Sequence, residues 1–203
     1  MKRTAVKDKQ WQDHYSRRAK KENFPARSIY KLKEIQQKYN LIKRGDIVLD
    51  LGCSPGSWLL YTANLAGSTG QVIGIDIQPV NIEVPSNAQI YIADVLSGDD
   101  AWLESLGLKF NVVLSDMAPA TTGHKTVDAA RSFNLCQAAL AIAKRVLIAD
   151  GTFVCKIFQG QDFNVFSEAV AAVFKEKMIF KPRSSRKASK EMFIIGLGLK
   201  KMP

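Results

Sequence analysis

Cysteine is scarce in this sequence, which has only Cys53, Cys136 and Cys155, and no two of them have CxxC spacing. This excludes a disulfide framework and the usual zinc-binding patterns. Long hydrophobic runs are absent too, so the sequence predicts no membrane-spanning segment. Residues 1–15 are charged and lack the apolar stretch of a secretory signal. We therefore expect a cytoplasmic protein that needs neither a metal nor a membrane.

Acidic residues are outnumbered: 29 Lys and Arg stand against 19 Asp and Glu, which gives a net charge of +10. The excess is concentrated in two places. Residues 1–27 hold nine basic and three acidic side chains, and a second basic cluster runs from Lys175 to Lys190. Clusters of this kind are typical of proteins that contact a phosphate backbone. The pattern favours a nucleic-acid partner over a merely solvated basic surface.

With 203 residues and 46% hydrophobic content, the chain is long enough for one ordinary domain. Nearly continuous apolar strands alternate with helical patterns, which predicts an α/β fold with a mostly parallel sheet covered on both faces. Strands are expected at 46–51, 71–77, 89–95, 110–117 and 151–158, with helices at 26–40, 57–67, 99–107 and 127–150. A helix at 163–177 and an antiparallel pair at 178–182 and 191–200 follow. We expect a basic N-terminal arm over 1–23 and a single domain over 24–203.

The run "DLGCSPGSW" (50–58) joins the first strand to a helix, where open parallel sheets bind ligands. Gly52 and Gly56 allow a ligand to approach the backbone closely. The G-x-x-x-G spacing matches neither the G-x-G-x-x-G dinucleotide pattern nor the P-loop, which needs a following Lys. Pro55 also removes one amide donor. The run therefore favours a nucleoside without phosphates, S-adenosylmethionine, over a pyrophosphate ligand such as NAD.

Three carboxylates stand at successive strand ends and suit such a nucleoside. Asp76 is placed to accept the ribose hydroxyls, Asp94 an adenine amine, and Asp50 to orient the loop or meet an ammonium group through a water. Trp58 is expected to pack near the ligand. Each aspartate alone is also compatible with an ordinary helix cap.

A second set of residues indicates chemistry on an oxygen atom. "LSDMAPATTG" lacks the Asn/Asp-Pro-Pro-aromatic run of amino-methylating enzymes, and no cysteine is placed as in cytosine C5 enzymes. Lys156 lies in the otherwise apolar "FVCKIFQG", next to the strand that ends at Asp116. A lysine in such a strand is either functional or at an exposed strand end. Glu191 and Lys31 are placed to reach the same sheet edge.

These motifs resemble those of the RrmJ/FtsJ family of ribose 2′-O-methyltransferases over roughly residues 11–200. The matching segments are "ARSIYKLKEI", "DLGCSPGSW", "LSDMAPATTG", "FVCKIFQG" and "SSRKASKEMFIIG". The resemblance implies a Rossmann-like seven-stranded methyltransferase fold with an antiparallel last strand. It also implies a tetrad of Lys31, Asp116, Lys156 and Glu191, and cofactor contacts at Gly56, Trp58, Asp76, Asp94 and Asp116. Cys53-Ser54 and Gly56-Ser57 depart from the Ala-Ala and Gly-Gly of bacterial ribosomal members.

From this resemblance we expect methylation of a uridine 2′-hydroxyl in large-subunit ribosomal RNA. Transfer to a tRNA anticodon loop, and a non-catalytic RNA-binding homologue, are the alternatives. A cap-type messenger RNA substrate is disfavoured because no cap-stacking module is evident. RNA is expected to bind through phosphate contacts with Arg17, Arg18, Lys20, Lys21, Arg27, Arg183, Arg186, Lys187 and Lys190.

Overall fold

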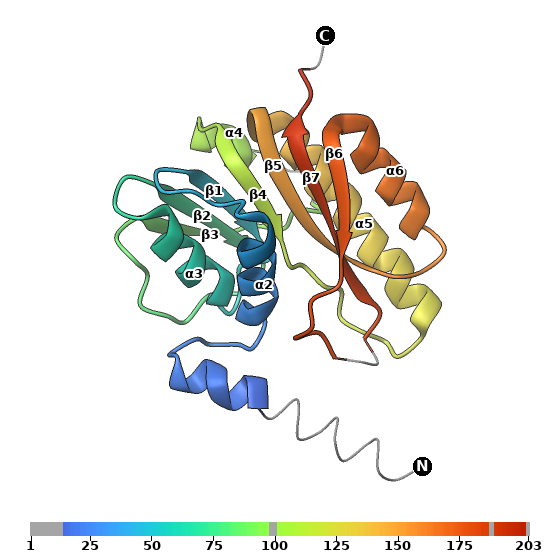
Figure 1. The fold of residues 1–203 in the computed structure, drawn as a ribbon, viewed down its shortest axis with the longest axis horizontal. Helices are drawn as coiled ribbons and strands as arrows, with labels where there is room; N and C mark the ends of the chain where they lie inside the picture. Colours follow the sequence, from blue (N-terminus) through green and yellow to red (C-terminus); the bar gives the residue numbers. More distant parts are fainter. Residues whose placement is uncertain (1–13, 98–100, 187–188, 202–203) are drawn as a thin grey trace.

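The computed structural model describes residues 14–97, 101–186 and 189–201. Its centre is a seven-stranded sheet of order β3-β2-β1-β4-β5-β7-β6 (Figure 1). The strands are β1 (Ile47–Leu51), β2 (Gln71–Asp76), β3 (Ala88–Ile92), β4 (Phe110–Ser115), β5 (Leu147–Phe158), β6 (Phe174–Phe180) and β7 (Glu191–Leu199). β1 to β5 pair in parallel, whereas β7 is antiparallel to both β5 and β6. The predicted fold class and the antiparallel last pair are confirmed.

Helices cover both faces of the sheet. They are α2 (Ile29–Tyr39), α3 (Ser57–Ala66), α4 (Ala101–Leu106), α5 (Lys125–Val146) and α6 (Phe163–Val173). α2 and α3 lie on one face, and α5 and α6 lie on the other. Each face has its own apolar core, centred on residues such as Leu59 on the first face and Phe153 on the second. Burial on both faces explains why the strands read as nearly continuous apolar runs.

The order of the strands places the candidate site. The chain builds β1, β2 and β3 outward in one direction and then returns to place β4 on the other side of β1. The segments that follow β1 and β4 therefore diverge at the carboxyl edge, which is where open α/β sheets bind ligands. Because β7 is antiparallel to β5, its first residue, Glu191, pairs with Phe158 at the end of β5. An acid that is distant in sequence is thus brought to the same edge.

The two largest errors in the predicted boundaries are at the ends of helices. Residues 147–150 belong to β5 rather than to the preceding helix, and 174–177 belong to β6 rather than to α6. Both segments continue an apolar pattern that also fits a helix. Pairing decides otherwise, because Leu147 aligns with Phe110 and Phe174 aligns with Leu199. Tertiary pairing outweighs local periodicity in both segments.

The N-terminal arm also has more structure than its sequence indicates. Residues 14–21 are helical. Ala19 is buried beside Ile29 and Tyr30, and Tyr15 packs against the same small cluster. One alanine and one tyrosine give too weak an apolar stripe to be recognised by periodicity.

Candidate active site

The glycine-containing turn after β1 is fixed by hydrogen bonds to β2. The Gly52 and Cys53 amides donate to the Ile75 carbonyl at 2.8 and 3.2 Å, and the Ser54 amide donates to Asp76 Oδ2 at 2.9 Å. Gly52 has φ +78°, and a Cβ atom there would lie 2.5 Å from Met117 Cγ. Only glycine therefore fits where this turn passes the residues that follow β4.

A cavity of about 680 Å³ opens beside this turn, at the carboxyl ends of β1, β2, β3 and β4. Its polar lining includes the carboxylate residues Asp76, Asp94 and Asp116. Ile77 and Leu96, 60% and 53% exposed, give it apolar walls. Apolar walls with a few converging polar groups are typical of small-molecule sites. The combination fits a nucleoside such as that of S-adenosylmethionine, whose base needs apolar contact and whose ribose needs acceptors.

Not every predicted cofactor residue lines the cavity. Gly52 does, but Gly56 lies against Val80 and Ile82, and Trp58 is buried in the core. The Trp58 indole donates to the Ser28 carbonyl at 2.9 Å and stacks on Phe193 at 5.8 Å between ring centroids. Its ring therefore holds α2 and β7 to α3. Any cofactor contact from Trp58 must come from its backbone in the first turn of α3, where amides lack helical partners.

Asp50 is completely buried, and neither of its carboxylate oxygens has a hydrogen-bond partner in the described part of the chain. Burial, reinforced by repulsion from Asp116 and Asp76, raises the pKa of Asp50 to about 8. A buried acceptor without a donor costs free energy unless it is protonated or meets a cation. Asp50 lies in β1, two residues before Gly52, but it does not line the cavity, so its role toward an ammonium group stays a prediction.

We expect the unliganded protein to lose stability on going from pH 6 to pH 8, relative to Asp50→Asn. The folded pKa lies above the unfolded value of about 3.9, so ionisation favours the unfolded chain throughout that window. Thermal unfolding should show the melting temperature of the wild type falling by roughly 5–10 °C against the variant. Glu168→Gln, at an exposed carboxylate, is the control. A gap between wild type and Asp50→Asn that does not change with pH would contradict the assignment.

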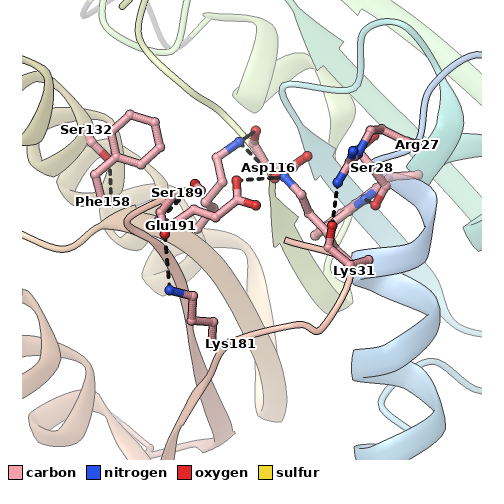
Figure 2. A network of polar contacts seen from close by, with 12 residues as sticks. Arg27, Ser28, Lys31, Asp116, Ser132, Phe158, Lys181, Ser189 and Glu191 are labelled. Carbon is pink, nitrogen blue, oxygen red and sulfur yellow. Dashed lines mark hydrogen bonds and ion pairs between the residues drawn. The ribbon is translucent and has the colours of Figure 1, made fainter. Parts of the chain in front are cut away.

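The four predicted tetrad residues lie together at the neighbouring part of the sheet edge. Figure 2 labels three of them, Lys31, Asp116 and Glu191. Lys156 Nζ lies 2.8 Å from Asp116 Oδ1 and also donates to the Asp116 carbonyl. Lys31 Nζ lies 2.9 Å from Glu191 Oε2 and 3.6 Å from Asp116 Oδ1. The four charged groups therefore alternate in sign, in the order Lys156, Asp116, Lys31 and Glu191. Asp116 also lines the cavity, so the tetrad and the candidate cofactor site adjoin.

The lysine of α2 is held in its charged form. Burial lowers the pKa of Lys31, but attraction by Asp116 and Glu191 outweighs burial and leaves this pKa above its usual value. Burial likewise raises the pKa of Asp116, and Lys156 and Lys31 overcome this and bring it below its usual value. Asp116 is thus an ionised carboxylate between two cations.

The connection between β6 and β7 is held by hydrogen bonds to α2, through Glu34, and to the segment just before α2, through Arg27. The Glu34 carboxylate accepts the Arg183 amide at 2.6 Å and the Ser184 amide at 2.8 Å. The Arg27 guanidinium donates to the Ser184 carbonyl at 2.6 Å. Because Glu191 opens β7 at the end of this connection, these bonds help to place its carboxylate beside Lys31.

The basic residues predicted to bind RNA divide into two groups. Arg17, Lys20, Lys21, Arg183, Arg186 and Lys190 are exposed, and Arg18, also exposed, forms an ion pair with Glu22 at 2.6 Å. Arg27 is partly buried and donates a hydrogen bond to the Ser184 carbonyl, so it also stabilises the β6–β7 connection. Lys187 lies outside the described residues.

Sequence reasoning missed some residues of the cavity. Met117, Arg131 and Asn134 line it, the last two from α5. Met117 directly follows Asp116, which was a usable signal. Nothing in the local pattern of α5 distinguishes Arg131 or Asn134 from other polar positions on a helix.

The described residues contain no group of three or more His, Cys, Asp or Glu side chains that could hold a metal ion. Among the same residues, no helix is both long enough and apolar enough to span a membrane.

Comparison with known proteins identifies the family. The model of the FtsJ-like methyltransferases matches residues 24–199. The ribosomal RNA large subunit methyltransferase E of Desulforapulum autotrophicum is 52% identical over 198 residues, 98% of each chain. The protein of that name from Desulfosudis oleivorans is 49% identical, over 98% of this chain and 97% of its own.

Solved structures support the fold. A candidate ribosomal RNA methyltransferase from Plasmodium falciparum superposes with a TM-score of 0.77 at 23% identity, covering 88% of this chain and all of the other. Human methyltransferase-like protein 13 in complex with SAH has a TM-score of 0.59 at 14% identity, covering 84% and 82%.

Proposed function

This chain belongs to the FtsJ-like methyltransferase family, and from that premise we propose that it methylates the 2′-hydroxyl of a uridine in large-subunit ribosomal RNA. The near full-length likeness to ribosomal RNA large subunit methyltransferases E supports the choice of substrate. The observation that carries the reaction is the tetrad beside the cavity, since Asp116 belongs to both. The basic surface of the arm and of the β6–β7 connection supports RNA as the partner.

The cavity residues are suited to hold S-adenosylmethionine. Asp76 and Asp94 would accept hydrogen bonds from the ribose and the adenine, between the apolar walls of Ile77 and Leu96. Asp50 is fully buried and would meet an ammonium group through a water. When bound, the cofactor would supply an electrophilic methyl group on a positively charged sulfonium.

The tetrad must place the 2′-hydroxyl and remove its proton, because a neutral hydroxyl is a weak nucleophile. The pKa of Lys31 is raised by its two carboxylate neighbours, so Lys31 is the cation that stays charged and orients the hydroxyl together with Glu191. Lys156 is then the group that takes the proton, held by Asp116 at 2.8 Å. To accept that proton, Lys156 must enter the reaction as a neutral amine, and Asp116 then keeps Lys31 as its nearby cation, at 3.6 Å.

Transfer of labelled methyl from S-adenosylmethionine tests the proposal, with undermodified large ribosomal subunits and bulk tRNA offered side by side. We expect label on the subunit RNA, at a ribose, and none on tRNA. Label on tRNA would assign the protein to anticodon-loop modification. Label on neither RNA, with cofactor binding intact, would overturn the proposed substrate.

A further inference from the structure

A second cavity, separate from the one that adjoins the tetrad, lies on the outer side of α2. It measures about 650 Å³, and we call it the α2 groove. Its lining includes Arg18, Tyr30, Lys33, Lys38, Phe180 and Arg183. None of its lining residues belongs to the tetrad, and none lines the first cavity.

The groove combines positive charge with aromatic rings. Arg18 lies over the Tyr30 ring at 4.9 Å from its centroid, and Lys38 lies over Phe180 at 5.0 Å. Glu34 is the acidic residue of the lining, and its carboxylate is engaged by the Arg183 and Ser184 amides. Cations interleaved with aromatic faces suit a nucleotide, since the phosphate needs the charge and the base needs a ring.

The cations of the groove differ in whether an acid already neutralises them. Arg18 and Lys33 share the Glu22 carboxylate, at 2.6 and 2.5 Å. In contrast, Lys38 and the Arg183 side chain form no ion pair with an acid among residues 14–97, 101–186 and 189–201. Both residues are exposed at the surface. Uncompensated charge at the rim of a cavity attracts an anionic partner.

Two of the three segments that line the groove, α2 and the end of β6 with the connection that follows it, also lead to tetrad residues. α2 carries Lys31 between the groove residues Tyr30 and Lys33, and Lys38 follows about two turns, or roughly 10 Å, further along the axis. Phe180 ends β6, and the connection that begins there ends at Glu191. A nucleotide that flanks a target ribose at the tetrad is therefore within reach of the groove.

We propose that the α2 groove binds an unpaired nucleotide that flanks the target in the RNA strand. Its phosphate lies against Lys38 and Arg183, and its base lies against Phe180. This inference rests on the proposed function for the identity of the strand. Its consequence is that the enzyme requires the target to stand in a locally single-stranded segment.

The test measures binding of a fluorescein-labelled single-stranded RNA of about ten nucleotides by anisotropy, over a series of salt concentrations. We expect Lys38→Ala/Arg183→Ala to weaken binding about tenfold or more at low salt and to reduce the salt slope by about 1.4, or 0.7 for each lost phosphate contact. Phe180→Leu keeps an apolar side chain and removes the ring. It should weaken binding about fivefold or more while leaving the salt slope unchanged.

The matched control is Lys43→Ala/Lys144→Ala, which removes the same charge from two exposed lysines just before β1 and β5, at the opposite edge of the sheet. Thermal unfolding checks that each variant is folded. Groove variants that bind like this control, or wild-type protein that does not bind the RNA, overturn the proposal. Methyl transfer by the wild type to ribosomal subunits is scored separately, so failure of the groove and failure of the proposed function are distinguishable.

Discussion

Replacing Lys156 with alanine is expected to reduce kcat for methyl transfer by about 10³-fold or more, with little change in affinity for S-adenosylmethionine. Lys156 is 5% exposed, and Asp116 holds its ammonium at 2.8 Å beside the cavity. General acid–base catalysis contributes about 10²–10⁴-fold, and loss of hydroxyl positioning adds to it. Single-turnover rates measure the loss of methyl transfer, and calorimetry measures the affinity for the cofactor separately.

Lys156→Arg distinguishes a base from a fixed cation. Arginine keeps the positive charge but does not lose its proton in proteins. If Lys156 accepts the hydroxyl proton, the arginine variant should be nearly as inactive as the alanine variant. An arginine variant within tenfold of wild type would show that Lys156 only positions the hydroxyl.

The second large effect is expected at Asp116, on stability as well as on activity. Asp116→Asn takes from Lys156 its ion-pair partner and leaves Lys31 paired with Glu191, in a site whose side chains are 5–13% exposed. Breaking one member of a buried ion pair costs about 3–5 kcal/mol. We expect the melting temperature to fall by about 6–20 °C, and methyl transfer to be undetectable.

The pH dependence of this loss has a definite sign. The folded pKa of Asp116 lies below its unfolded value of about 3.9, so its contribution is complete above that pH and is lost as pH falls through the folded pKa. The gap between wild type and Asp116→Asn should therefore be constant near neutrality and should shrink in acid.

A double variant isolates the buried charge. Asp116→Asn/Lys156→Met removes both members of the pair and should recover most of the lost stability without any activity. A double variant as unstable as Asp116→Asn would mean that Asp116 stabilises the fold through something other than its charge. Glu191→Gln, which keeps the Lys156–Asp116 pair, is the matched control for the loss of one tetrad carboxylate.

The sequence alone determined the fold class and predicted which residues form the two candidate sites. Strands buried on both faces must be apolar throughout, so their alternation with helices indicated a parallel sheet. The carboxyl ends of parallel strands meet at one edge, which predicted that Asp50, Asp76 and Asp94 would come together. Asp76 and Asp94 do line the cavity, whereas Asp50 is buried in β1. Lys156 stood out because it lies in an otherwise apolar strand, and a buried lysine requires a partner for its charge.

Tertiary structure decided what depends on pairing and on contacts between distant segments. Residues 147–150 and 174–177 fit a helix locally, and only their partners in the sheet made them strands. Trp58 was expected at the cofactor, but its indole bonds to Ser28 in the core, a contact that no spacing in the sequence encodes. The α2 groove joins the arm, α2 and the end of β6, which lie far apart along the chain. Local patterns specify which face of an element is buried, whereas the fold specifies which neighbour it is buried against.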